Sequence, residues 1–228
     1  MKIYLLKERH DTRIKEIEKL LHSSNIETIL LEKSKLTNLV GEVNHQGVIA
    51  DVLPSQKYYT ALEDFLHDHD LTNALFLILD GVLDPHNLGA CLRSANAAGV
   101  TAVIVPKDNA VGITPVVRKV ACGAAEILPF IQVTNLSRAL QTLQDHNIWI
   151  YGAATDATKT IYEIDYTSAT AIVLGAEEKG LRRLTREYCD ELVSIPMIGD
   201  MPSLNVSVAT GICLFEVVRQ RQHKTINN

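Results

Sequence analysis

Short apolar runs alternate with amphipathic segments along the chain from about residue 74 onward. The runs are apolar at nearly every position, which is typical of strands buried on both faces of a sheet. Strands are predicted at Leu75–Leu79, Ala102–Val105, Phe130–Val133, Ile148–Tyr151, Ala171–Leu174 and Leu192–Ile195. Helices are predicted at Asn87–Ala98, Thr114–Cys122, Leu136–His146, Leu184–Cys189 and Ser203–Arg219. This alternation predicts an α/β fold in which a mostly parallel sheet carries helices on both faces.

The first part of the chain predicts a separate, smaller α/β unit over residues 1–53. Its strands are predicted at Ile3–Leu6, Thr28–Leu31 and Gly47–Leu53, and its helices at Thr12–Ser23 and Lys35–Val40. About fifty residues is a marginal size for an independent core. Residues 54–73 are polar and charged and predict a linker that contains a short helix. We therefore predict a small unit at 1–53, a linker at 54–73 and a main domain at 74–228.

Composition narrows the class of protein. The chain has 228 residues, of which 46% are hydrophobic, enough for a packed core. No apolar run approaches the roughly 18 residues of a membrane span, and no signal-peptide pattern is present, so we expect a cytoplasmic protein. Its four cysteines lie far apart, which favours buried thiols over a metal site. The net charge of −5 argues mildly against a nucleic-acid partner, although local basic clusters can still contact phosphates.

Several familiar nucleotide and hydrolase motifs are missing from the sequence. No Gly-x-Gly-x-x-Gly follows a predicted strand, no Gly-Lys-Ser/Thr occurs, and there is no Gly-x-Ser-x-Gly elbow. Candidate chemistry is therefore confined to three loops that follow predicted strands. Loops at the carboxyl ends of parallel strands are where α/β proteins build ligand sites.

The last of these loops precedes the final predicted helix. Pro196 ends the strand, because proline cannot donate to a ladder, and Ser203 and Asn205 lie where the helix begins. Backbone N–H groups point outward unpaired at such a position. An ordinary core strand followed by a capped helix explains the segment equally well. Positions of helical spacing form an apolar stripe, with small residues beside it for close backbone approach: Leu204, Val208, Ile212 and Phe215, next to Ser207 and Gly211.

The two earlier loops each carry polar residues beside glycine or proline. In the first, Asn87 is predicted as a helix cap, and it converges with Arg93 only if Arg93 projects from the second turn. A capped helix with a surface arginine is the alternative. In the second loop, Gly175 and Gly180 bracket Glu177, an acid at the end of an apolar strand. Taken alone this pattern is a weak signal.

Three motifs within these loops occur in a fixed order. They are Asp84-Pro85-x-Asn87-x-Gly89-Ala90-x-x-Arg93, Gly175-Ala176-Glu177-x-x-Gly180-Leu181 and Ile195-Pro196-Met197-x-Gly199-x-x-x-Ser203-Leu204-Asn205-Val206-Ser207-Val208-Ala209. Together they resemble the three motifs of SpoU-type (TrmH-type) RNA ribose methyltransferases, and the resemblance covers about residues 74–221. Within that family the match is close to bacterial enzymes that methylate one guanosine ribose of 23S rRNA, in the tRNA-contacting loop of the peptidyl-transferase centre.

The resemblance implies an S-adenosylmethionine-dependent 2′-O-methyltransferase whose sheet ends in a deep trefoil knot, a rare exception to unknotted chains. It also implies a homodimer packed through helices that include the last one. Residues 1–53, including Asn44–Gly47, resemble the family's L30e-like RNA-binding domain, which selects the substrate. The chain begins at what resembles that domain's first long strand. We therefore expect either an upstream start codon or a truncated domain with one poorly covered sheet face.

Site residues follow from the same resemblance. The cofactor is expected to contact Gly175, Ile195 and Leu204 largely through their backbone, within loops that also include Leu174, Met197 and Gly180. Arg93 matches the family's invariant arginine. The remaining polar family positions are Asn87, Glu177, Ser203 and Asn205. Glu178 stands where the family usually has glycine, and if that position uses a positive φ the substitution costs about 1 kcal/mol or more.

The chemistry of such a site can be argued from the residue types. A ribose 2′-hydroxyl is a poor nucleophile, so alignment with the methyl donor provides much of the rate. The pKa of arginine is about 12.5 or above, which favours Arg93 as a clamp and electrostatic stabiliser over the general base that is often described. Glu177 is expected to orient Arg93 or Asn87, and Ser203 or Asn205 to accept the ribose hydroxyl.

Basic residues near the site predict contacts to RNA phosphates. They are Lys179, Arg182, Arg183 and Arg186, with Arg118 and Lys119 on a second helix, where a solvated face is the alternative. We predict methylation of a guanosine ribose in 23S rRNA by a protein with no metal and no membrane partner. A tRNA ribose methyltransferase and a non-catalytic RNA-binding protein are the alternatives.

Overall fold

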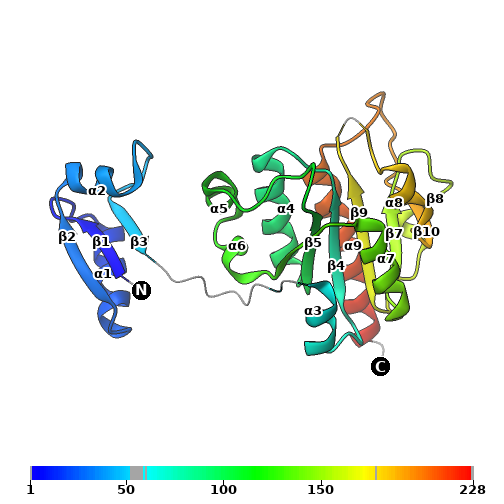
Figure 1. Cartoon of the computed structure of the whole chain (residues 1–228), viewed down its shortest axis with the longest axis horizontal. Helices are drawn as coiled ribbons and strands as arrows, with labels where there is room; N and C mark the ends of the chain where they lie inside the picture. The colour runs from blue at the N-terminus through cyan, green and yellow to red at the C-terminus, as the bar shows by residue number, and fades with distance from the viewer. Residues whose placement is uncertain (1, 52–58, 60, 178, 227–228) are drawn as a thin grey trace. The chain divides into compact units, whose positions relative to one another are not determined.

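A computed structural model describes residues 2–51, 59, 61–177 and 179–226. The chain forms two compact units, Met1–Ser55 and Gln56–Asn228. Each unit has its own sheet, so the two are described separately (Figure 1).

The first unit is a three-stranded sheet in the order β2-β1-β3 with two helices. Strand β1 pairs parallel to β2 and antiparallel to β3. Helix α1 begins where Asp11 accepts hydrogen bonds from the backbone N–H groups of Arg13 and Ile14. Ile3, Leu5 and Leu21 form the buried core between α1 and the sheet. The elements are β1 (Lys2–Leu6), α1 (Thr12–Ser23), β2 (Glu27–Leu31), α2 (Lys33–Val40) and β3 (Val48–Asp51).

The second unit is built on a seven-stranded sheet in the order β6-β5-β4-β9-β7-β10-β8, and every neighbouring pair is parallel. The predicted α/β class with a mostly parallel sheet is therefore confirmed. The trefoil knot stays a prediction. The strands are β4 (Leu75–Asp80), β5 (Ala102–Pro106), β6 (Phe130–Val133), β7 (Trp149–Ala153), β8 (Lys159–Thr160), β9 (Thr170–Gly175) and β10 (Glu191–Ser194).

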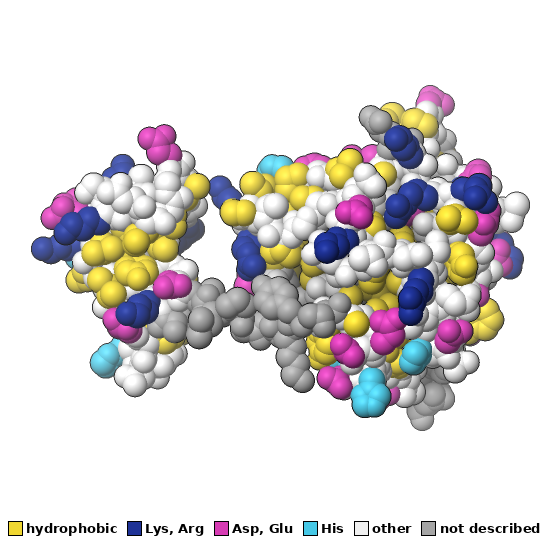
Figure 2. Space-filling view, viewed as in Figure 1, with side chains coloured by type: hydrophobic (Ala, Val, Ile, Leu, Met, Phe, Trp, Pro, Cys, Tyr) yellow, Lys and Arg dark blue, Asp and Glu magenta, His cyan; other side chains and the backbone are white. Residues whose placement is uncertain are grey.

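Helices cover both faces of this sheet, as predicted (Figure 1). One hydrophobic cluster lies under α4, α5, α6 and α9, and the other lies under α3 and α7. Figure 2 shows basic and acidic side chains interspersed over the face that carries α7 and α8. The helices are α3 (Leu62–Asp68), α4 (Pro85–Ala97), α5 (Pro115–Ala121), α6 (Ala124–Ile127), α7 (Leu136–Asp145), the 3₁₀ helix η1 (Ile161–Glu163), α8 (Arg183–Glu187) and α9 (Val206–Ile226).

Several details of these elements differ from the sequence predictions. Helix α3, predicted to lie in a linker, packs into the second unit because Leu62, Phe65 and Leu66 are buried in its core. The short elements α6, β8 and η1 were not predicted, since segments of a few residues carry no readable periodicity. The last helix begins at Val206 rather than Ser203, because the side chain of Asn205 accepts a hydrogen bond from the backbone N–H of Ser207.

Candidate active site

Polar side chains from three distant segments meet where β4 and β9 end and α9 begins. Asn87 Nδ2 donates to Glu177 Oε1 at 2.6 Å. Asn205 Nδ2 donates to the same oxygen at 2.8 Å and to Asn87 Oδ1 at 3.1 Å. One residue from each of the three motifs thus contributes to a closed triangle of hydrogen bonds. We call this triangle, Asn87, Glu177 and Asn205, the polar cluster.

The orientation of the Asn205 amide is set by its position at the start of α9. Its Oδ1 accepts from the backbone N–H of Ser207 at 2.9 Å and from Ser207 Oγ at 2.6 Å. With the oxygen occupied there, the NH₂ group faces Glu177. The cluster is therefore held by hydrogen bonds within the chain.

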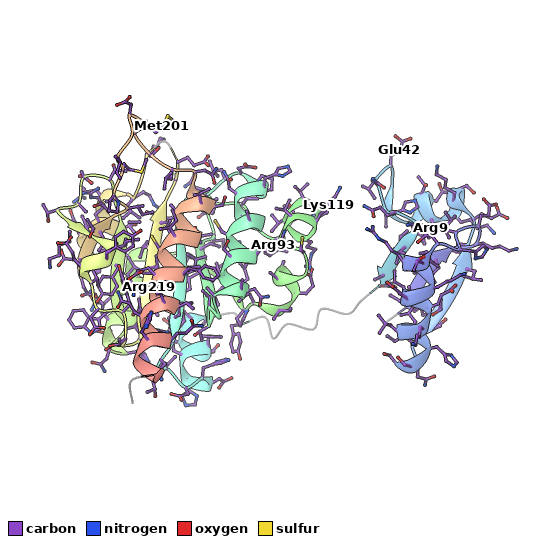
Figure 3. The ribbon with its side chains drawn as sticks, turned by 180° about the vertical axis from the view of Figure 1, so that it is seen from behind. Arg9, Glu42, Arg93, Lys119, Met201 and Arg219 are labelled. Atoms are coloured by element: carbon purple, nitrogen blue, oxygen red, sulfur yellow. The ribbon has the colours of Figure 1, made fainter. Side chains whose placement is uncertain are left out.

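Arg93 lies outside this cluster. Helix α4 is capped by Asp84, which accepts from the backbone N–H of His86, so Asn87 lies within the first turn and the predicted Asn87 cap is wrong. Asn87 and Arg93 therefore lie on different faces of the helix, as six residues at about 100° each require. Arg93 projects toward α5, where its Nη1 lies 3.7 Å from Cys122 Sγ (Figure 3). Within one chain, Asn87 and Arg93 do not converge, and Arg93 is a surface arginine.

The loop after β9 is a tight turn that only glycine permits at its first position. The backbone N–H of Gly180 donates to the carbonyl of Ala176 at 2.8 Å. A Cβ on Gly175 would lie 2.0 Å from the carbonyl carbon of Gly180, a distance that real side chains do not tolerate. Gly180 has φ +61°, in the left-handed region. The expected penalty of Glu178 falls on a residue outside the described part of the chain.

The larger of two adjoining cavities has a volume of about 680 Å³. Every residue predicted to hold the cofactor lines it. Ser203 also lines this cavity, as does Glu177 of the polar cluster. Its walls come from the ends of β7, β9 and β10 and from the segment that leads into α9. The predicted cofactor residues lining it are Leu174, Gly175, Gly180, Ile195, Met197 and Leu204.

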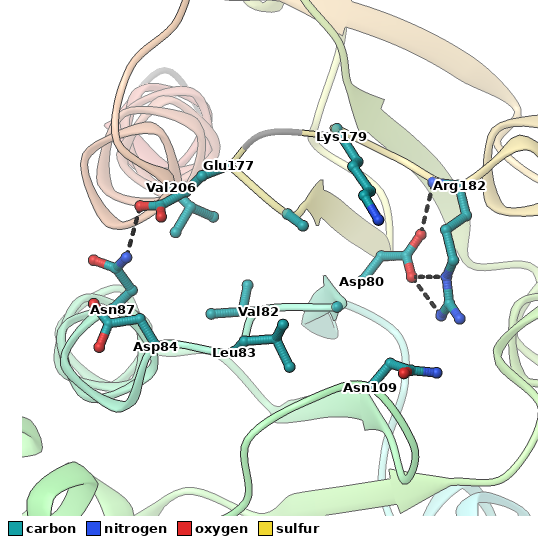
Figure 4. A pocket seen from close by; sticks show the side chains of 13 residues that line it. Asp80, Val82, Leu83, Asp84, Asn87, Asn109, Glu177, Lys179, Arg182 and Val206 are labelled. Atoms are coloured by element: carbon teal, nitrogen blue, oxygen red, sulfur yellow. Dashed lines mark hydrogen bonds and ion pairs between the residues drawn. The ribbon is translucent and has the colours of Figure 1, made fainter.

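The smaller cavity, about 540 Å³, shares Glu177 and Lys179 with the larger one (Figure 4). Asn87 lies at one end of it, and Arg182 and Lys179 lie at the other. The buried carboxylate of Asp80, at the end of β4, forms an ion pair with Arg182. Sequence reasoning did not single out Asp80; an acid that directly ends an apolar strand was the available signal.

Most of the predicted basic cluster is neutralised by ion pairs. Arg183 pairs with Glu187, and Arg186 donates two hydrogen bonds to Asp156, at 3.0 and 2.8 Å. The hydrogen bond from Arg186 also lowers the pKa of Asp156. Arg182 pairs with Asp80, as described above. Among the four described basic residues at positions 179–186, Lys179 alone has no carboxylate partner, and on the second helix Arg118 pairs with Glu126.

The cysteines follow the prediction of buried thiols only in part. Cys91 and Cys213 are buried, and burial raises the pKa of Cys91 to about 11 and that of Cys213 to about 12. Cys122 is exposed, contrary to the prediction, because it ends α5 at the surface in the left-handed conformation. In the described part of the chain, no three His, Cys, Asp or Glu side chains gather as a metal site requires. Within the same residues, no helix is long and apolar enough to cross a bilayer.

Comparison with known proteins identifies the class to which this fold and site belong. Residues 74–215 match the SpoU rRNA Methylase family, and the chain belongs to that family. Residues 1–58 match a second model, described as RNA 2′-O ribose methyltransferase substrate binding.

Individual relatives of the chain carry more specific names than the family does. The chain is 53% identical to the 23S rRNA (guanosine-2′-O-)-methyltransferase RlmB of Pasteurella multocida, over 97% of this chain and 90% of the relative. It is 55% identical to the protein of the same name in Coxiella burnetii, over 97% and 88%. Among solved structures it is similar to the SpoU methyltransferase AviRb of Streptomyces viridochromogenes in complex with AdoMet, with 26% identity, a TM-score of 0.78 and coverage of 97% and 83%.

A tRNA enzyme of the family is also similar, over a smaller part of the chain. The TrmH/SpoU tRNA modifying enzyme of A. aeolicus is 30% identical with a TM-score of 0.61, over 68% of this chain and 80% of that one.

Proposed function

We propose that this protein transfers a methyl group from S-adenosylmethionine to the ribose 2′-hydroxyl of a guanosine in 23S rRNA, in the cytoplasm. The named relatives at 53% and 55% identity support the reaction and the substrate. The structural observation that carries the proposal is the polar cluster. Three loops far apart in sequence place Asn87, Glu177 and Asn205 beside two adjoining cavities.

The larger cavity fits the cofactor. Its volume of about 680 Å³ lies within the range of small-molecule sites, and glycine and apolar residues provide much of its wall. A Cβ at Gly175 would collide with the backbone that forms this wall, so the loop is built for close backbone approach. Gly175, Gly180, Ile195 and Leu204 would hold the cofactor, with Leu174 and Met197 beside them. When bound, S-adenosylmethionine supplies an electrophilic methyl group on its sulfonium.

The polar cluster is suited to hold the ribose hydroxyl. Glu177 Oε1 accepts from both asparagine amides, and a carboxylate retains further acceptor sites on its second oxygen. A hydroxyl that donates to Glu177 is polarised toward the alkoxide, and its position is fixed by groups that do not need to reorganise. Ser203, on the wall of the larger cavity, is a second acceptor for the same hydroxyl.

Arg93 requires a second copy of the chain to take part. Its side chain is exposed and lines neither cavity. Helix α4, which carries it, packs beside α9, where a Cβ on Gly211 would lie 3.9 Å from Ser94 Oγ. The apolar residues Val208 and Phe215 of α9 are each 49% exposed. We propose a homodimer that buries this stripe and brings Arg93 to the partner's site, as clamp and electrostatic stabiliser.

The experiment that tests the function is transfer of labelled methyl from S-adenosylmethionine to unmodified 23S rRNA and to unmodified tRNA, followed by mapping of the modified nucleotide. The expected product is one 2′-O-methylguanosine in 23S rRNA. Labelling of tRNA alone would overturn the choice of substrate. A chain that binds RNA but neither binds the cofactor nor transfers methyl would be a non-catalytic RNA-binding protein.

A further inference from the structure

The smaller cavity has two chemically different ends (Figure 4). Asn87 and Glu177 of the polar cluster lie at one end, and the cations Arg182 and Lys179 lie at the other. Between them, Val82 and Leu83 contribute apolar surface (Figure 4). A cavity of about 540 Å³ with this division suits a ligand that has a hydroxyl group and an anionic group at opposite ends.

Arg182 is held in place by a carboxylate that solvent cannot reach. The side chain of Asp80 is 0% exposed, whereas that of Arg182 is 49% exposed. Asp80 Oδ2 accepts from the backbone N–H of Arg182 at 3.0 Å, and its Oδ1 accepts from the guanidinium Nε and pairs with Nη2. This arrangement fixes both the backbone and the guanidinium of Arg182. Because a guanidinium has five N–H donors, Nη1 retains donors for a ligand in the cavity.

Lys179 adds the second cation on the same wall. Its side chain extends into the smaller cavity, and it has no carboxylate partner among the described residues (Figure 4). The neighbouring Arg183 lines neither cavity and pairs with Glu187 on the exposed surface of α8. Lys179 and Arg182 thus line the smaller cavity, whereas Arg183 lines neither cavity and Arg186 lines only the larger one.

We propose that Arg182 and Lys179 bind the phosphodiester next to the target ribose, and that Asp80 acts as a positioning residue for Arg182. This inference rests on the proposed function, because the ribose hydroxyl must reach the polar cluster. In RNA the target ribose is joined to phosphodiesters through its 5′ and 3′ oxygens, and the one on the 5′ side lies across the sugar from the 2′-hydroxyl. Phosphate contacts from arginine and lysine set the register of a nucleic acid without reading its sequence.

The test measures binding of a 23S rRNA transcript across a salt series for Arg182→Gln, Lys179→Gln and the matched control Arg183→Gln. Each lost phosphate contact should reduce the slope of log K against log salt by about 0.7 to 0.9. We expect that reduction, and a KM for the transcript raised about tenfold, for the first two variants. The control should change both quantities little, and all three should bind S-adenosylmethionine as wild type does.

Asp80→Asn separates positioning from a purely structural role. If Asp80 acts through Arg182, the double variant Asp80→Asn/Arg182→Gln should have the same KM and salt slope as Arg182→Gln alone. An additive loss in the double variant would overturn the positioning role. If Asp80→Asn does not fold, the Arg182 and Lys179 variants still decide the phosphate contact.

The outcomes separate this inference from the proposed function. If the wild-type chain binds the transcript but transfers no methyl, the proposed function is overturned. The salt slopes of the variants still show whether Arg182 and Lys179 contact a phosphate. The inference is overturned, and the proposed function is unaffected, if the salt slopes of Arg182→Gln and Lys179→Gln equal that of Arg183→Gln. A weaker affinity for S-adenosylmethionine with unchanged RNA binding would assign Lys179 to the cofactor and also overturn it.

Discussion

Only glycine fits at position 175, where the chain forms one wall of the larger cavity. It ends β9 and begins the turn that folds back at Gly180. The atoms that a Cβ would meet all belong to the backbone of Gly180 and Leu181, which cannot rotate away as a side chain can. The residues of this turn also line the larger cavity, so a distortion of the turn changes the shape of that cavity.

Gly175→Ala is expected to lower cofactor affinity by at least tenfold, which corresponds to about 1.4 kcal/mol. The added methyl must separate Gly180 from β9, which also destabilises the fold by about 1 to 3 kcal/mol through overpacking. Isothermal titration with S-adenosylmethionine and urea unfolding measure the two effects. Gly199→Ala is the control, because a Cβ there would meet no atom within 4 Å. Equal cofactor affinity in the two variants would contradict this account of the turn.

Helix α9 has apolar residues on more than one side. Val206, Leu214 and Val217 are buried in the core of the second unit, whereas Val208 and Phe215 are half exposed on another face of the helix. A helix that is apolar around most of its surface is normally covered on all of it. The polar cluster lies at the start of this helix, so a partner that covers α9 also approaches the site.

Phe215→Glu is expected to convert a homodimer into a monomer of 25.2 kDa, because a charge placed in an apolar interface opposes association. Size-exclusion chromatography with light scattering measures the mass. Leu184→Glu is the matched control, since Leu184 is 48% exposed on α8 and lies on neither α4 nor α9. A wild-type chain that is already monomeric at micromolar concentration would contradict the dimer.

The C-terminal part of α9 contains a buried acid, Glu216, which is bonded to the next turn of the same helix. Glu216 accepts hydrogen bonds from Arg219 at 2.8 and 2.7 Å and from Gln220 at 2.8 Å. The Arg219 bond, followed by that from Gln220, holds the pKa of Glu216 below its ordinary value of 4.5. A carboxylate whose pKa is lowered by folding stabilises the protein above its unfolded pKa. That contribution is lost as the pH falls through the folded pKa.

Glu216→Gln should therefore lower the free energy of unfolding at neutral pH by about 1 to 3 kcal/mol, the contribution of hydrogen bonds to a charged group. The difference between wild type and variant should shrink as the pH falls below 4.5. Urea denaturation at a series of pH values measures it, and subtraction removes the titration of other acids. A difference that stays constant down to a pH of about 3 would show that the charge of Glu216 contributes nothing.

At the scale of the whole molecule, the proposed active site is incomplete in one chain. The polar cluster and both cavities belong to a single copy, whereas Arg93 projects from the other side of α4 toward α5. In a twofold dimer each copy can supply the arginine to its partner. In the proposed homodimer, the partner's arginine would therefore be required for catalysis and not only for stability.

Mixing Arg93→Ala with Asn205→Ala tests this arrangement. Each variant alone should bind S-adenosylmethionine but transfer no methyl to 23S rRNA. After exchange of subunits, activity should return to about a quarter of wild type, because half of the dimers are mixed and each has one complete site. No recovery after verified exchange would mean that both residues act within one chain, and an active Arg93→Ala protein would exclude the arginine altogether.

The sequence alone determined the class of fold and predicted the candidate site residues. Uniformly apolar runs such as Leu75–Leu79, separated by amphipathic helices, are sufficient for a parallel sheet covered on both faces, because that pattern suits few other structures. Three motifs in order identified Asn87, Glu177 and Asn205. All the residues that the resemblance predicted to contact the cofactor line the larger cavity. These properties are local, or follow from order along the chain.

Only the tertiary structure decided which of these residues meet. Asn87 and Arg93 belong to one motif but lie on different faces of α4, because Asp84 caps the helix earlier than the sequence suggested. Asp80 and Arg182 lie far apart in sequence. They form an ion pair because the fold places β4 beside the loop after β9. Pairing and burial depend on the direction of side chains in space, which the order of residues does not contain.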